Sequence, residues 1–322
     1  MPKRIALTGV TGFIGAHVLE RLLLDGHQVS CLVRAGRVFD RVPGVRYCVG
    51  ELRDPESLRE LLTGVETVVH LAGLTRAKTE ADYNEVNALA VERLVALARS
   101  VSPDFDHIVA MSSLAAMGPA RDELGICEDE PFQPITPYGR SKALLESLAA
   151  PGVAWTFIRA PGVYGPRDKD FLQYFRLVNK GLRLVIGKRN VMSLVYVKNL
   201  ADAIAVCVQK PEARGEAFFI ADEGCYDWDD IGLMIEDCLG KTALRLRVPF
   251  WAVRVASLFS QLAMPFVRMP PLLNKHKLAE MSQEYWVVST DKARKLLGYT
   301  PRMGTKDAFC DTASWYAEQG WL

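Results

Sequence analysis

Apolar runs of strand length alternate with segments of helical periodicity through the first half of the chain. Nearly continuous apolar runs rich in Val and Ile are typical of strands that a parallel sheet buries on both faces. We predict strands at Arg4–Gly9, Gln28–Arg34, Val45–Gly50, Thr67–Ala72, His107–Ser113 and Trp155–Pro161. Amphipathic segments between them predict helices at Gly12–Asp25, Pro55–Leu62, Ala81–Ser100 and Tyr138–Ala149. Because this alternation with right-handed crossovers places helices on both faces of a sheet, the predicted fold is an α/β doubly wound parallel sheet.

The pattern changes after Pro161, where the elements become shorter. We predict helices at Asp170–Lys180 and Asn199–Gln209, and strands at Arg183–Gly187, Val191–Val197, Glu216–Ala221 and Leu244–Val248. Residues 1–165, with about 190–222, are expected to form the main domain. Residues from about 166 to 189, with 223–322, are expected to form a smaller, mostly helical substrate lobe over the carboxyl ends of the strands.

A glycine-rich loop joins the first predicted strand to the first helix. It reads Thr8-Gly9-Val10-Thr11-Gly12-Phe13-Ile14-Gly15. Glycines spaced by three in this setting let the backbone turn tightly and direct helix N–H groups at a pyrophosphate. A strand–helix turn with a purely structural role is the alternative. We predict a Rossmann-like dinucleotide site with these cofactor contacts: Gly9, Thr11, Gly12, Phe13, Ile14 and Gly15.

The end of the second strand bears on the choice of cofactor. A site that prefers NAD usually places Asp or Glu there, to bind the ribose 2′-hydroxyl. Here the strand ends at Arg34, and no acidic residue follows before Asp40. Because a guanidinium can pair with a 2′-phosphate and stack on adenine, we predict NADP as the preferred cofactor. The alternative, in which Arg34 only packs on adenine and NAD is used, stays open.

The ends of the third and fourth strands supply further candidate contacts. Glu51 and Leu52 stand where an adenine-contacting pair is expected, and Leu71, Ala72 and Gly73 allow a close approach to the cofactor. His70 is interpreted as a packed, hydrogen-bonded core histidine rather than a catalyst.

A serine, a tyrosine and a lysine form the candidate catalytic group. Ser113 ends the fifth strand, and Tyr138 and Lys142 share one face of the helix that begins near them. A free phenol titrates near pH 10, and a neighbouring ammonium is expected to lower that pKa. Ser113 would bind the substrate oxygen, Tyr138 would exchange its proton, and Lys142 would also reach the nicotinamide ribose. Tyr138 and Lys142 are therefore predicted cofactor contacts as well.

Several motifs together resemble a known family. The chain resembles the extended short-chain dehydrogenase/reductases, the NAD-dependent epimerase/dehydratase family, over essentially its whole length. The motifs that carry the resemblance are TGVTGFIG, HLAG, SSLAAMG, YGRSK and RAPGVYGPRD. The resemblance implies that Ser113, Tyr138 and Lys142 are catalytic, and that Asn87 is the structural asparagine of the family. It also implies that Pro161 and Val163 flank the nicotinamide carboxamide.

The chain departs from the family pattern at three positions. Met117 replaces a common tyrosine, Glu51 a common aspartate and Tyr196 a common histidine, which leaves the substrate undefined. The segment Val195–Ala201 and the C-terminal residues resemble 3β-hydroxysteroid dehydrogenase and dihydroflavonol reductase-like members. That resemblance implies an oxidoreductase that interconverts a secondary alcohol and a ketone on a hydrophobic steroid-, isoprenoid- or flavonoid-like substrate.

Two other functions stay open at this stage. One is a sugar-nucleotide 4-epimerase or dehydratase that retains its NAD, with Arg167, Lys188 and Arg189 near a diphosphate. The other is a non-enzymatic, cofactor-sensing or scaffold protein, against which the intact catalytic group argues.

Composition removes several classes of partner. With 39 basic and 38 acidic residues the net charge is +1, and no long basic run indicates nucleic acid binding. The seven cysteines are scattered and odd in number, and the five histidines have no metal-ligand spacing. These patterns argue against a metal site and against a disulfide framework.

The chain ends and the longest apolar stretch bear on location. The N-terminus runs directly into a strand without an apolar leader, from which we expect a cytoplasmic protein. Residues 248–273 are apolar but interrupted by Arg254, Gln261 and Arg268, so a transmembrane helix is not expected. A buried helical pair is favoured there, and peripheral membrane contact and a homodimer are left open.

Overall fold

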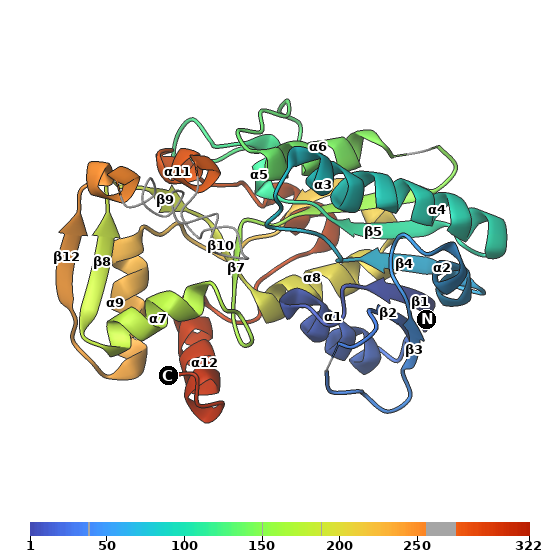
Figure 1. Ribbon diagram of the computed structural model, residues 1–322, viewed down its shortest axis with the longest axis horizontal. Coiled ribbons are helices and arrows are strands. Elements are labelled where there is room, and N and C mark those ends of the chain that lie inside the picture. The colour runs from blue at the N-terminus through green and yellow to red at the C-terminus, as the bar shows by residue number, and fades with distance from the viewer. Residues whose placement is uncertain (38, 150, 188, 256–274) are drawn as a thin grey trace.

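The computed structural model describes residues 1–37, 39–149, 151–187, 189–255 and 275–322. Its main sheet contains β1 (Arg4–Thr8), β2 (Gln28–Val33), β3 (Arg46–Val49), β4 (Thr67–His70), β5 (His107–Met111), β6 (Ala154–Arg159) and β11 (Ala217–Phe219). The seven strands are parallel in the order β11-β6-β5-β4-β1-β2-β3 (Figure 1). The chain thus winds outward from β1 in both directions, which confirms the doubly wound α/β prediction. The strand predicted at Glu216–Ala221 is the seventh.

Helices cover both faces of this sheet. They are α1 (Phe13–Leu24), α2 (Pro55–Leu62), α4 (Ala90–Val101), α6 (Pro137–Ser147) and α8 (Val197–Gln209). Leu22 of α1 and Ile204 of α8 belong to one fully buried cluster, which packs on one face. Leu61, Leu94 and Leu145 from α2, α4 and α6 belong to a second cluster on the other face. Burial of apolar side chains on both faces explains why the strands read as continuous apolar runs.

The long helix predicted at Ala81–Ser100 is interrupted, which corrects the prediction. The segment consists of α3 (Glu80–Asn84), one π-helical turn (Glu85–Leu89) and α4. Thr79 and Asp82 form a capping box that starts α3. The wide turn contains the buried Asn87, whose side chain bonds to the backbone of Leu74. π-Turns inside helices occur frequently at functional sites.

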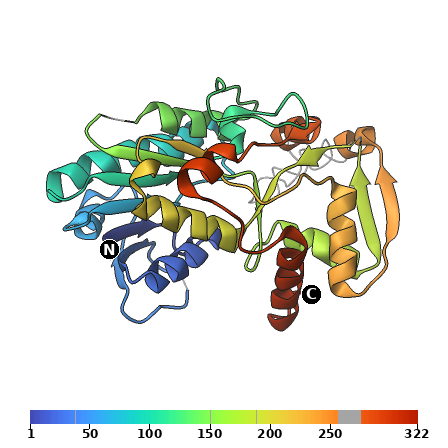
Figure 2. The ribbon, with the colours of Figure 1, turned by 180° about the vertical axis from the view of Figure 1, so that it is seen from behind.

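The later segments build a second lobe beside the main sheet (Figures 1 and 2). It contains α7 (Phe171–Asn179), β8 (Leu182–Ile186), α9 (Trp228–Leu239), β12 (Leu244–Val248), α11 (Lys275–Met281) and α12 (Thr305–Glu318). Its core is aromatic: the rings of Tyr164 and Phe309 stack at 4.3 Å between centroids, and Phe175 and Tyr316 are fully buried beside them. Aromatic side chains bury a large apolar area each, which suits a lobe this small.

Short strands join the lobe to the main sheet and depart from the predictions. β7 (Gly162–Tyr164) pairs with β10 (Leu194–Tyr196), and β9 (Val191–Met192) pairs with β13 (Tyr285–Trp286). The strand predicted at Val191–Val197 is therefore split at Ser193, whose hydroxyl accepts a hydrogen bond from Val288 N at 3.2 Å. The strand β13 was not predicted, because two residues carry too little pattern to identify.

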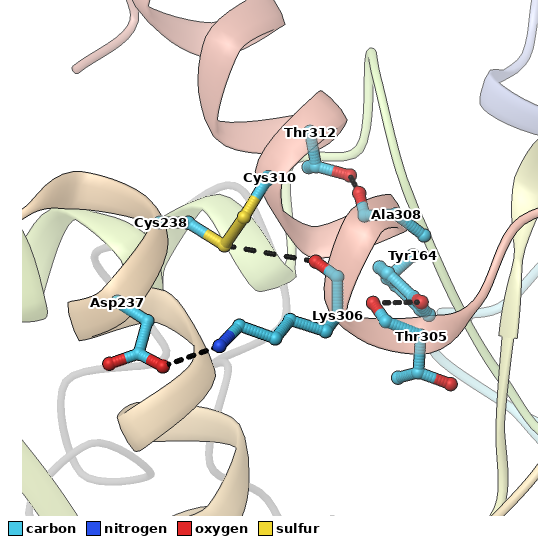
Figure 3. Close-up of a disulfide and its surroundings, with 8 residues drawn as sticks. All are labelled: Tyr164, Asp237, Cys238, Thr305, Lys306, Ala308, Cys310 and Thr312. Carbon is cyan, nitrogen blue, oxygen red and sulfur yellow. Dashed lines mark hydrogen bonds and ion pairs between the residues drawn. A yellow bond between two sulfur atoms is a disulfide. The ribbon is translucent and has the colours of Figure 1, made fainter.

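A disulfide between Cys238 and Cys310 corrects the expectation drawn from the cysteines (Figure 3). It joins α9 to α12, which lie side by side although the two cysteines are 72 residues apart. Such a distant pair leaves no spacing signal in the sequence.

No helix within the described ranges is long and apolar enough to span a bilayer. Most of the apolar stretch at 248–273, from Ala256 onward, lies outside the described residues.

Candidate active site

The turn between β1 and α1 has the geometry of an anion cradle. Gly9 has φ of +82°, and a Cβ there would lie 2.7 Å from Ala72 N. A Cβ on Gly15 would lie 2.1 Å from Gly9 O, so only glycine allows this packing. Thr11 and Gly12 are exposed. No side chain caps the start of α1 and its first turn has no acidic residue, so its N–H groups suit a pyrophosphate.

The other predicted cofactor contacts lie along the same sheet edge. Because β3, β2, β1 and β4 are adjacent parallel strands, the residues after them meet at their carboxyl ends. These residues are Arg34, Glu51, Leu52, Leu71, Ala72 and Gly73. Arg34 is exposed and makes no ion pair within the described ranges, so its guanidinium is available to a ligand. Phe13 and Ile14 are half-buried and pack on the aromatic core of the second lobe.

His70 packs as the sequence suggested. Its Nδ1 lies 2.9 Å from Thr8 Oγ1, and its side chain is buried. Burial, with a smaller contribution from the Lys142 charge, lowers the pKa of His70 to about 3. The imidazole is therefore neutral at ordinary pH, and it holds β1 against β4 beneath the cradle.

Ser113 and Tyr138 are brought together by two helices that pack closely. Ser113 follows β5 and caps α5 (Leu114–Met117), and Tyr138 lies in the first turn of α6, which Thr136 caps. A Cβ on Gly139 would lie 2.2 Å from Ala115 O, so glycine permits this close approach. Burial raises the pKa of Tyr138 to about 12, and a hydrogen bond with Ser113 opposes that shift.

Lys142 lies one helical turn beyond Tyr138 but does not set the pKa of the phenol in this structure. Its Nζ donates a 2.7 Å hydrogen bond to Met111 O, and it lies beside Gly73. Burial lowers the pKa of Lys142 to about 8, and the Glu146 carboxylate opposes that shift. The expectation that Lys142 lowers the pKa of Tyr138 is thus corrected, because burial of the phenol is the dominant cause.

Asn87 connects these elements across the site. Its Oδ1 accepts from Leu74 N at 2.7 Å, and its Nδ2 donates to Leu74 O at 3.0 Å and to Ser141 Oγ at 2.9 Å. Ser141 in turn donates to Tyr138 O. The side chain therefore joins the segment after β4 to the helix that carries Tyr138 and Lys142.

A buried ion pair behind the site was missed by the sequence reasoning. Arg159 of β6 and Glu146 of α6 are paired at 2.8 Å, and Ser112 Oγ donates to Glu146 at 2.5 Å. Arg159 also donates to Glu128 O at 2.8 Å. An arginine ending an apolar strand, and an acid one turn after Lys142, were the available signals. The network fixes the strand end next to Ser113.

A cavity of about 470 Å³ opens over Ser113 and Tyr138. Its apolar wall includes Leu114, Leu177, Leu184, Ile186, Trp228 and Met281. Polar residues at the wall include Asp170, Gln173, Asn190, Ser193, Lys277 and Glu280. Pro161 also lines the cavity, whereas the half-buried Val163 packs into the two cores on either side.

The basic residues that the epimerase alternative would place near a diphosphate are not found at the cavity. Arg167 pairs with Glu20 at 3.4 Å, and Arg189 pairs with Glu123 at 3.3 Å. Neither lines the described cavity wall. Lys188 lies outside the described residues.

Comparison with known proteins agrees with this geometry. The family model described as the NAD dependent epimerase/dehydratase family matches residues 5–221. A ceramide reductase of Caulobacter vibrioides is 27% identical, over 99% of this chain and 96% of the relative. A 4-hydroxy-2-methyl-3-oxo-4-farnesyl-3,4-dihydroquinoline-1-oxide ketoreductase of Stigmatella aurantiaca is 28% identical, over 93% and 92%.

A solved structure of similar shape is the dTDP-glucose 4,6-dehydratase DesIV of Streptomyces venezuelae, with NAD and TYD bound. Its TM-score is 0.78 at 21% identity, over 99% of this chain and 98% of that one. At this identity the likeness shows the shared fold.

The site and the fold define an enzyme of the extended short-chain dehydrogenase/reductase type. The chain belongs to the NAD-dependent epimerase/dehydratase family.

Proposed function

We propose that this enzyme interconverts a secondary alcohol and a ketone on a hydrophobic, lipid-like substrate, and that NADP is its preferred cofactor. The observation that carries the proposal is the cavity above Ser113 and Tyr138, whose wall is largely apolar. Apolar walls with a few placed polar groups are typical of sites for hydrophobic small molecules. The similarity to a ceramide reductase and to a ketoreductase of a farnesylated quinoline supports the same substrate class.

The catalytic roles follow from the positions of three side chains. Ser113 holds the substrate oxygen by a hydrogen bond, and Tyr138 exchanges a proton with that oxygen. A phenol with a pKa near 12 keeps its proton at neutral pH, as the acid in ketone reduction must. Lys142, beside Gly73, contacts the nicotinamide ribose.

The cofactor contacts extend from the cradle to the far strand ends. When bound between these residues, a nicotinamide cofactor would supply or take up the hydride at the carbon that bears the substrate oxygen. Gly9, Thr11, Gly12, Phe13, Ile14 and Gly15 hold the pyrophosphate. Arg34 binds the 2′-phosphate, and Glu51 and Leu52 contact adenine. The nicotinamide half of the cofactor site is bordered by Leu71, Ala72, Gly73, Pro161 and Val163. Residues 1–165 with about 190–222 form the dinucleotide-binding domain in this proposal, and the rest form the substrate lobe.

A substrate screen tests the proposal. The purified protein is mixed with NADPH or NADH and with hydrophobic ketones of steroid, isoprenoid and flavonoid type, and loss of reduced cofactor is followed by absorbance. We expect consumption with at least one lipid-like ketone and a preference for NADPH. Purified protein that carries tightly bound NAD and interconverts nucleotide sugars without net consumption would instead establish the epimerase alternative.

A further inference from the structure

The two-stranded ribbon of β8 and β12 has one arginine-bearing face and one leucine-bearing face. The parallel register places Leu244 beside Leu182, Arg245 beside Arg183, and Leu246 beside Leu184. Arg183 and Arg245 both pair with Asp229, at 3.1 and 2.6 Å, so the arginine face is turned toward α9. Because side chains alternate along a strand, the leucines lie on the opposite face.

The leucine face is largely uncovered where β12 forms the outer edge of the lobe (Figure 1). Leu244 is 69% exposed, Leu246 47% and Leu182 37%. The helical turn that follows β12 exposes Trp251 and Val255 as well. We call these five side chains the outer apolar face. Exposed large apolar side chains on neighbouring segments of one lobe indicate a contact surface.

The outer apolar face is continuous with the wall of the cavity. Leu184 and Ile186 lie on the same side of β8 as Leu182 and line the cavity over Ser113 and Tyr138. Their neighbours in β12 are Leu246 and Val248. An apolar path therefore runs from the exposed edge of the ribbon into the site.

The charged residues in this part of the sequence are all of one sign, although Arg245 is paired with Asp229 of α9. Between Asp237 and Glu280 the sequence contains no Asp or Glu, but it contains Lys241, Arg245, Arg247, Arg254, Arg268, Lys275 and Lys277. The whole chain has a net charge of only +1, so this is a local asymmetry. Exposed Leu and Trp side chains with nearby arginines are the combination that binds the interface of an anionic bilayer.

We propose that the outer apolar face docks this protein on the surface of an anionic lipid bilayer, where a lipid-like substrate can pass along the leucines into the cavity. The inference of substrate passage rests on the proposed function, whereas the docking itself rests on the exposed side chains and the charge asymmetry. Trp251, Leu244 and Leu246 enter the headgroup region, and Arg254, exposed in the helical turn after β12, meets lipid phosphates.

Vesicle flotation with the full-length protein, without cofactor or substrate, tests the docking. Vesicles of phosphatidylcholine alone are compared with vesicles that also contain phosphatidylserine. We expect the wild type to float with the anionic vesicles and to be released by high salt. The double substitution Leu244→Ser and Leu246→Ser should weaken binding about tenfold or more. Leu24→Ser, at an 82% exposed leucine on α1, is the matched control and should bind as the wild type does.

Two further variants and one further measurement separate the alternatives. Arg254→Gln should weaken the preference for phosphatidylserine, whereas Arg247→Gln, on the opposite face of the ribbon, should leave it unchanged. Wild-type protein that binds neither vesicle, or a double serine variant that binds as tightly as wild type, would overturn the proposal. If the serine substitutions convert a dimer to a monomer and wild type ignores vesicles, the face is a contact between two copies and the proposal is wrong. Failure of the ketone screen would sink the proposed activity and leave the flotation result standing.

Discussion

The ammonium of Lys142 donates a 2.7 Å hydrogen bond to the carbonyl oxygen of Met111, the last residue of β5. The bond ties α6 to the strand end that Ser112 and Ser113 continue. Since Tyr138 lies one turn before Lys142 on the same helix, this contact helps to set the relative positions of Tyr138 and Ser113. The positive charge is held in a buried place close to Gly73, where the proposed cofactor site passes.

Replacing Tyr138 by Phe should remove the proton donor and leave the packing intact. Positioned proton transfer contributes about 10² to 10⁴ in rate, so turnover should fall by that factor while cofactor affinity barely changes. Tyr83→Phe is the control, because its ring lies 6.2 Å from that of Tyr138 but its hydroxyl donates to Thr75 O at 3.3 Å and not to the Ser113–Tyr138 pair. Steady-state turnover and cofactor titration measure the two effects. A Tyr138→Phe enzyme within a few-fold of wild type would mean that another group is the acid.

Arg34→Asp should reverse or erase the preference for NADPH. The exposed guanidinium has no ion pair within the described ranges, and loss of a charge-assisted bond to the 2′-phosphate is worth about tenfold to a hundredfold in affinity. Binding of NADPH and NADH is measured by fluorescence titration. Arg59→Asp, in the last turn of α2, makes the same charge change elsewhere and should leave the ratio unaltered. Equal affinities of wild type for both cofactors would refute the assignment.

The lowered pKa of Lys142 predicts a dependence of stability on alkaline pH. Its pKa is about 8 in the folded protein, against 10.5 for an ordinary lysine. Between these values the unfolded chain binds more protons than the folded chain, so the free energy of unfolding should rise with pH across this window. The gain relative to Lys142→Met should be on the order of 1–3 kcal/mol. Denaturant unfolding of both proteins from pH 7 to 10.5, without cofactor, measures it. Parallel curves for the two proteins would show that Lys142 titrates normally.

Removing the disulfide should destabilise the second lobe. Cys238→Ser or Cys310→Ser opens the link between α9 and α12, beside the 2.8 Å ion pair of Asp237 and Lys306 (Figure 3). A cross-link over this separation contributes about 2–4 kcal/mol. Thermal unfolding of each variant should match that of the reduced wild type. Cys127→Ser, at an exposed free cysteine, is the control and should unfold like the oxidised wild type.

The parallel sheet and the cradle could be predicted because their determinants are local. Strands such as Thr67–His70 are buried along their whole length, and the glycines at 9 and 15 are required by close contacts within the turn and with the segment after β4. The helical spacing of Tyr138 and Lys142 is likewise a local property. Ser113 could be placed in the site because the carboxyl ends of parallel strands meet at one edge of the sheet, where ligands bind.

The features that could not be predicted from the sequence depend on contacts between segments far apart in the chain. Only the packed structure pairs Cys238 with Cys310, joins Glu146 to Arg159, and raises the pKa of Tyr138 by burying its ring. Burial and pairing are sums over neighbours from many parts of the chain, so no window of sequence contains them. The sequence by itself therefore determined the order of elements and the catalytic residue types. The tertiary structure decided their electrostatics, the shape of the cavity and the apolar face that leads into it.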